Sequence, residues 1–135
     1  MSSIPQIEEK ISVEKAKFIS PLSLAFVGDS VYSLYVRASL CVETDSKSGD
    51  LTKLTISMVC AEAQSKLMKE ILPKLDEEEL GVYKRARNAK IHNFPSHATI
   101  SEYREATGFE ALLGYLYLTG QNQRIKELLG ENNAD

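Results

Sequence analysis

The residues from Phe18 to Val36 read FISPLSLAFVGDSVYSLYV and include a single charged side chain, that of Asp29. A run this long and apolar raises the question of a membrane span, but Pro21, Gly28, Asp29 and several serines within it argue against one. A buried helix of a helical bundle is the better interpretation. An unpaired ionised carboxylate in such a helix costs several kcal/mol. The sequence therefore predicts that Asp29 has either a cation nearby or a chemical role.

A second apolar stretch, ATGFEALLGYLYLTGQNQ at 106–123, also carries one charge, Glu110. Each acid has a small residue one helical turn away, Ala25 for Asp29 and Gly114 for Glu110, which predicts room for water, an ion or a phosphate. If the two helices pack together, the two like charges converge. A divalent cation would then keep both carboxylates ionised.

A structural role is the alternative for both acids. Single buried acids are often hydrogen-bonded to backbone amides or paired with Arg or Lys. Glu110 could also serve the N-terminal end of a helix that is broken at Gly108.

Length and composition indicate one globular domain. The chain has 135 residues, 43% hydrophobic and 26% charged, enough for a proper core in a single domain over 1–135 with flexible ends at about 1–10 and 130–135. The net charge of −3 gives no overall nucleic-acid signal, so a local basic patch would have to supply one. Cys41 and Cys60 indicate reduced, partly buried thiols, and the N-terminus lacks a signal-peptide pattern; both favour a cytoplasmic protein.

Hydrophobic spacing predicts helices nearly everywhere and no convincing strand, so the expected fold class is all-α. Ser12, Asp50, Asp76 and Ser101 each stand where a predicted helix needs a cap, and Pro21 suits a first helical turn. The predicted helices span about 12–18, 21–40, 50–72, 76–88, 101–119 and 122–129, with polar loops at 41–49 and 91–100.

A basic segment, KRARNAK at 84–90, contrasts with the acidic total. Together with Arg104 its cations make a local positive region suited to phosphates, and Asn88 adds a hydrogen-bond donor and acceptor. The alternative is a solvated helix end whose cations complement the negative end of the helix dipole. His92 and His97, in the loop that follows, lack helical ligand spacing, which favours surface histidines over a zinc site.

Three ordered motifs resemble those of ribonuclease III catalytic domains. LSLAFVGDSVYSLYVR at 22–37 resembles the family hallmark, with Asp29 at its aspartate, and GFEALLGYLYL at 108–118 resembles the second acidic motif, with Glu110 at its metal-binding glutamate. SGDLTKL at 48–54 falls where the family has a short loop-to-helix motif. The resemblance covers essentially the whole chain.

The match is closest to the Mini-III branch, whose members are a bare ribonuclease III domain. KRARNAK and YREATGFEALLGYLYL resemble stretches of that branch, and no double-stranded-RNA-binding domain follows Leu129, which also fits it.

Several family acids are missing here. Two further glutamates of the hallmark correspond to Leu22 and Ala25, an aspartate of the second motif corresponds to Thr107, and a further glutamate to Ser48. Mini-III proteins generally share this thinning, so it does not argue against activity. Fewer carboxylates remain to hold metal ions.

The resemblance implies an endoribonuclease that cleaves double-stranded RNA with Mg²⁺, for which Mn²⁺ can substitute, and Asp29 and Glu110 as its catalytic metal ligands. It also implies a homodimer built through the hallmark helix, maturation of the 23S ribosomal RNA precursor, and neither a membrane nor a DNA partner. The candidates for contacts with the RNA backbone are Lys84, Arg85, Arg87, Asn88, Lys90 and Arg104.

Two other functions stay open from the sequence. One is a catalytically silent relative that binds RNA or ribosomes as a helical dimer. The other is a structural dimerisation module in which Asp29 is a buried polar anchor.

Overall fold

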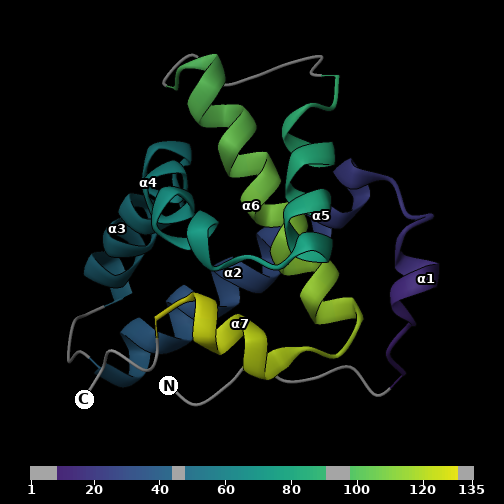
Figure 1. Cartoon of the computed structure of the whole chain (residues 1–135). Coiled ribbons are helices and arrows are strands. Elements are labelled where there is room, and N and C mark those ends of the chain that lie inside the picture. The colour runs from purple at the N-terminus through teal and green to yellow at the C-terminus, as the bar shows by residue number, and fades with distance from the viewer. Residues whose placement is uncertain (1–8, 44–47, 91–97, 131–135) are drawn as a thin grey trace.

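The computed structural model of the chain describes residues 9–43, 48–90 and 98–130. Within these ranges every regular element is a helix, which confirms the all-α prediction (Figure 1). The elements are α1 (Val13–Ala16), α2 (Pro21–Glu43), α3 (Ser48–Val59), α4 (Ala61–Ile71), the 3-10 helix η1 (Leu72–Lys74), α5 (Glu77–Arg87), α6 (Ile100–Leu118) and α7 (Asn122–Leu128).

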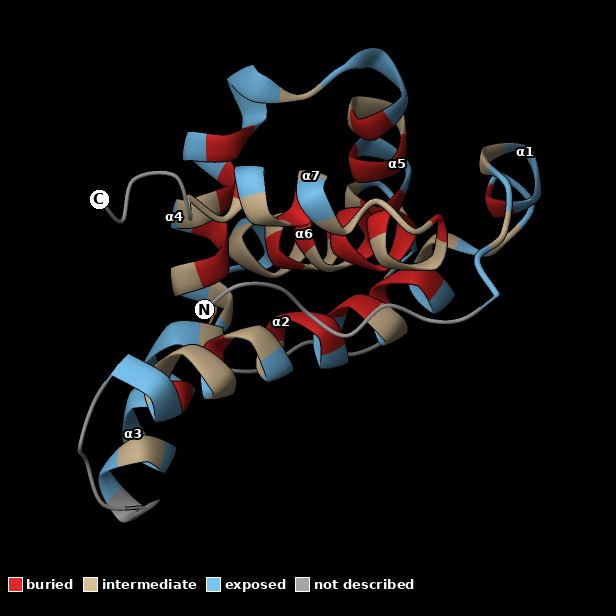
Figure 2. Cartoon of the chain, turned by 90° about the horizontal axis from the view of Figure 1, so that it is seen from below, coloured by how far each residue is buried: buried red, intermediate tan, exposed pale blue. Residues whose placement is uncertain are grey.

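Helix α6 lies at the centre of the bundle, and α2, α4, α5 and α7 pack around it. Figure 2 shows α6 buried along much of its length, and Phe109, Leu112, Leu113 and Leu116 are fully buried. The helix runs without a break through Gly108, so the alternative that placed Glu110 at a helix start is wrong. The prediction of Ser101 as its N-cap is also wrong. The N-cap is Thr99, whose side chain and backbone form a reciprocal capping box with Glu102.

The predicted long helix over 50–72 is wrong, because the chain breaks at Cys60. Cys60 takes an extended conformation (φ −69°, ψ 159°) at the N-cap position of α4, without a side-chain capping hydrogen bond. This break lets α3 pack on α2 while α4 turns back onto α6. Cys41 and Cys60 are both free and exposed, so the prediction of partly buried thiols is wrong as well.

Helices α2 and α6 cross so closely that two glycines form the contact. A Cβ atom on Gly28 would lie 1.6 Å from the Glu110 carbonyl oxygen, and one on Gly114 would lie 2.0 Å from the Leu24 carbonyl oxygen. Only glycine at both positions lets the two backbones touch. The prediction that Gly114 leaves room for a ligand is therefore wrong, because the backbone of α2 fills that space.

The prediction of a buried helix for the 18–36 run holds for one face of α2 only. Leu24, Gly28 and Val31 are buried toward the bundle. On the outer face Phe26 is 80% exposed and Asp29 is exposed. Figure 2 shows exposed positions recurring along the side of α2 that faces away from α6. No helix in the described part of the chain is both long and apolar enough to cross a membrane.

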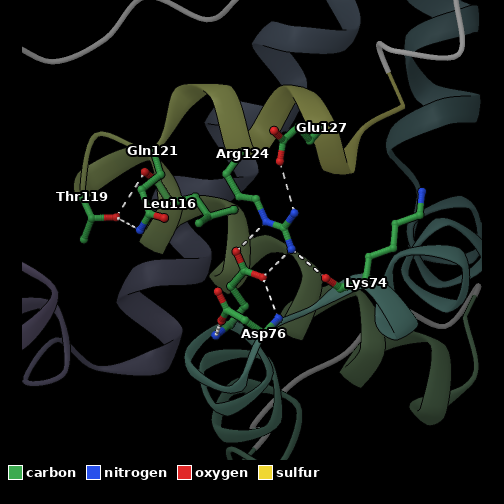
Figure 3. Close-up of polar contacts among 8 residues, drawn as sticks. Lys74, Asp76, Leu116, Thr119, Gln121, Arg124 and Glu127 are labelled. Atoms are coloured by element: carbon green, nitrogen blue, oxygen red, sulfur yellow. Dashed lines mark hydrogen bonds and ion pairs between the residues drawn. The ribbon is translucent and has the colours of Figure 1, made fainter.

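An ion pair between the buried Glu79 and the half-buried Arg124 fixes α7 against the start of α5 (Figure 3). The Arg124 guanidinium donates two hydrogen bonds to the Glu79 carboxylate, at 2.7 and 2.8 Å, and a third at 2.7 Å to the Lys74 carbonyl. Burial alone would raise the pKa of Glu79, but the hydrogen bonds from Arg124 and the Asp76 backbone outweigh it, and the pKa lies below its ordinary value. Both charges are thus paired and hydrogen-bonded, as burial requires.

We predict that Gly28→Ala or Gly114→Ala lowers the free energy of unfolding by about 3 kcal/mol or more, because the added methyl group has to push two helix backbones apart. Urea denaturation measures this. Gly81→Ala is the control, because a Cβ there has nothing within 4 Å, and it should stabilise the protein by about 0.5–1 kcal/mol. Equal stability of the Gly28→Ala variant and the wild type would contradict the glycine crossing.

Candidate active site

The close crossing of α2 and α6 brings two acids together. Gly28 rests on the backbone carbonyl of Glu110. Asp29, the next residue along α2, lies within hydrogen-bonding reach of the Glu110 side chain. The two carboxyl groups share a hydrogen bond. Asp29 is exposed, whereas Glu110 is half-buried. The site is thus a pair of carboxyl groups with one member open to solvent and the other set into the bundle.

Glu110 keeps its proton near neutral pH. The pKa of Glu110 is raised from 4.5 to about 8, first by burial and then by the negative charge and the hydrogen bond of Asp29. A proton on Glu110 relieves the repulsion between two adjacent negative charges.

Helix α4 adds a third polar side chain, which the sequence analysis missed. The Gln64 amide nitrogen donates to Glu110 Oε2 at 3.3 Å and to the Val59 carbonyl at 2.9 Å. Gln64 is only 2% exposed, and its Oε1 is buried without a hydrogen-bond partner. The sequence did hold a signal for Gln64 in its helical spacing. Gln64 lies on the same helix face as the buried Met68 and Ile71, where an apolar residue would be expected.

Two aromatic residues next to the acids in the sequence tie α2 to α6 in the core. Tyr32, one turn after Asp29, packs edge-on against Phe109 with the ring centroids 5.0 Å apart. Both residues are buried and belong to the hydrophobic core.

The basic residues predicted to bind RNA gather at the end of α5 and the start of α6. Lys84, Arg85 and Lys90 are exposed there. Arg87 lies over the Tyr83 ring, 5.4 Å from its centroid, and Arg104 donates to the Arg87 carbonyl at 3.4 Å.

Some of these cations therefore also hold the fold together. Arg87 donates to the Asn88 side chain at 3.3 Å, and Arg85 donates to the Lys17 carbonyl at 3.4 Å. His92 and His97 lie outside the described residues.

The donor set suits a hard divalent ion that keeps part of its water shell. Among the described residues there is no group of three or more His, Cys, Asp or Glu side chains arranged to hold a metal. Mg²⁺ is commonly bound through one or two carboxylates plus waters and phosphates, so Asp29 and Glu110 fit it. The unpartnered Gln64 oxygen is a further buried acceptor beside the pair. Thr107, at the position of a family aspartate, bonds instead to the Tyr103 carbonyl at 2.9 Å.

Comparison with known proteins defines the class. Residues 22–121 match the Ribonuclease III domain, and the chain therefore belongs to the ribonuclease III family of endoribonucleases, within which its relatives are Mini-ribonuclease 3 proteins. The Mini-ribonuclease 3 of Thermoanaerobacter sp. (strain X514) is 44% identical over 90% of this chain and 85% of its own length. That of Enterococcus faecalis is 44% identical over 84% of this chain and 87% of its own.

A solved structure agrees with this assignment. The crystal structure of a Fusobacterium nucleatum protein superposes with a TM-score of 0.79 at 35% identity, and the match covers 87% of this chain and 93% of that one. The resemblance and the fold expected from the sequence are thereby confirmed. Ribonuclease III enzymes typically depend on a metal, and the family implies a double-stranded RNA substrate.

We predict that Glu110→Gln stabilises the metal-free protein at high pH only. The folded protein keeps a proton on Glu110 that the unfolded chain releases above pH 4.5, so stability is lost as the pH rises from 4.5 to about 8. Each pKa unit corresponds to about 1.4 kcal/mol, so the melting temperature of the variant should exceed that of the wild type by about 5 °C or more at pH 8. The two should melt alike at pH 4.

Thermal denaturation in EDTA across this pH range measures the effect. Glu62→Gln is the control, since Glu62 is exposed on α4 and pairs with Lys66. A Glu110→Gln variant whose difference from the wild type does not change with pH would contradict the proton held at the site.

Proposed function

We propose that the protein is a divalent-metal-dependent endoribonuclease that cuts double-stranded RNA, with Asp29 and Glu110 as the ligands of Mg²⁺ or Mn²⁺. The observation that carries this proposal is that the close crossing of α2 and α6 places the carboxyl groups of Asp29 and Glu110 side by side. A divalent cation bound by both acids would offset their two negative charges. The family membership of the chain supports the reaction class.

The two acids have different parts in this reaction. Asp29 and Glu110 would hold Mg²⁺, which would supply the polarisation needed to activate a water for in-line attack on a phosphodiester and to neutralise the leaving oxygen. Asp29 is exposed and would face the RNA. Glu110 is half-buried and would hold the metal ion against the core helix α6. Glu110 must lose its proton when the site is loaded, so metal binding releases protons below about pH 8.

Duplex RNA is recognised mainly through its phosphates, its 2′-hydroxyls and its shape. Lys84, Arg85 and Lys90 are exposed, which suits them to phosphates. Arg87, Asn88 and Arg104 form a connected cluster that orients donors at the end of α5. We assign these six residues to the RNA backbone, and we assign the 23S ribosomal RNA precursor as the substrate by resemblance to the Mini-III branch.

Cutting both strands requires two sites, and the outer face of α2 suits a two-fold dimer. Phe26 projects there at 80% exposure. It borders an apolar cavity of about 270 Å³ that is also lined by Leu34 and Tyr117. A protruding ring and a hollow on the same face are self-complementary, as an isologous contact requires.

We predict that Asp29→Asn abolishes cleavage of duplex RNA in Mg²⁺ and leaves RNA binding intact, because the change removes a charge at almost constant size. Gel analysis of cleavage and a filter-binding assay measure the two properties. Asp50→Asn, on exposed α3, should cleave normally. Binding without cleavage by the wild type would indicate the silent relative, and neither activity would indicate the structural module.

For the dimer, we predict that Phe26→Asp converts the protein to a monomer. The interface would bury an unpaired carboxylate from each subunit, and the two-fold axis would bring the two negative charges close together. Light scattering coupled to size exclusion measures the mass. Phe18→Asp is the control and should remain dimeric. Phe18 is also a highly exposed phenylalanine, at 90%, but it lies before α2 begins at Pro21. A monomeric wild type would overturn this part of the proposal.

A further inference from the structure

Gln64 connects the carboxylate pair to the junction of α3 and α4. Its amide nitrogen bonds Glu110 Oε2 on one side and the Val59 carbonyl on the other. Val59 is the last residue of α3, where helix carbonyls have no partner within the helix. One amide therefore satisfies an orphaned carbonyl and holds a carboxylate at the same time.

The orientation of the Gln64 amide follows from these two acceptors. Turning the amide over would place Oε1 against the Val59 carbonyl and the Glu110 carboxylate, both of which need a donor. The observed orientation instead leaves Oε1 buried without a partner. A buried unpaired amide oxygen costs roughly 1–3 kcal/mol. An apolar side chain at this position would fill the core without that cost, as Met68 and Ile71 do on the same face of α4. The cost of the unpaired oxygen therefore indicates a role for Gln64 beyond packing.

The consequence for Glu110 is orientation. Glu110 has a long side chain that could turn its carboxyl group away from Asp29, which would also reduce the repulsion between the two charges once both are ionised. The bond from Gln64 holds Oε2 toward α4, and Gln64 itself is fixed by the α3–α4 junction and by its burial. One carboxylate oxygen is thus engaged by the protein, and the group keeps capacity on its other lone pairs.

We propose that Gln64 is a positioning residue for the metal site: its amide holds the Glu110 carboxylate beside Asp29 in the orientation that binds a divalent cation. This inference rests on the proposed function of Asp29 and Glu110 as metal ligands. Outer partners that orient a ligand typically contribute 10–100-fold to metal affinity or activity. Among the described residues no third His, Cys, Asp or Glu side chain joins the pair, so the alignment of these two carboxyl groups matters the more.

The test is the affinity for Mn²⁺, measured without RNA by titration calorimetry on the full chain. Gln64→Met keeps the length and packing of the side chain and removes the donor. We expect Mn²⁺ binding to weaken about tenfold or more. Ser65→Ala is the matched control, because Ser65 is equally buried on the same helix but bonds Glu105 rather than Glu110. It should bind Mn²⁺ like the wild type.

Cleavage kinetics separate positioning from general loosening. In Gln64→Met the kcat at limiting Mg²⁺ should fall and recover at high Mg²⁺, with KM for duplex RNA unchanged. Melting curves in EDTA establish that the variants are folded. Unchanged Mn²⁺ affinity in folded Gln64→Met, or an equal loss in Ser65→Ala, would overturn the proposal.

The wild-type protein supplies a measurement that no folding defect can affect. In NMR spectra the side-chain amide protons of Gln64 should be protected from exchange and should move when Mg²⁺ is added. Signals that do not move while Mg²⁺ binds would overturn the role of Gln64 alone. A wild type that binds neither Mg²⁺ nor Mn²⁺ would overturn the metal site and, with it, this inference.

Discussion

The contact between two helix backbones at Gly28 and Gly114 is the constraint on which the rest of the molecule depends. It sets α2 directly on α6, with the Gly28 position pressed on the Glu110 carbonyl and the Gly114 position on the Leu24 carbonyl. A larger residue at either position would separate the two helices and, with them, Asp29 and Glu110. The same contact that builds the core therefore also builds the site.

The two acids differ because of where this crossing places them. Asp29 faces outward and is exposed, whereas Glu110 points between α2 and α4, where burial and its neighbour raise its pKa to about 8. Asp29 is therefore the acid that solvent reaches, and Glu110 is the acid whose charged form burial disfavours. Gln64 donates to Glu110 from α4, and Tyr32 packs on Phe109 in the core.

The sequence predicted the helical class, the two lone acids and the family, because these depend on local spacing and on short motifs. It did not predict the break at Cys60, since nothing in the local pattern distinguishes one helix over 50–72 from two that pack on different partners. It also predicted that Gly114 leaves room for a ligand beside Glu110. A glycine in a helix can indicate either a cavity or a close backbone contact, and the sequence does not distinguish the two. The outward position of Asp29 depends on which face of α2 meets α6, which only the tertiary structure determines.

The central claim is that this crossing creates a site for one divalent cation between Asp29 and Glu110. The most direct measurement is an anomalous difference map from crystals soaked in Mn²⁺. The account predicts a peak between the two side chains, about 2.1 Å from a carboxylate oxygen of each. A peak elsewhere, or two carboxyl groups that still share a hydrogen bond at saturating Mn²⁺, would contradict it.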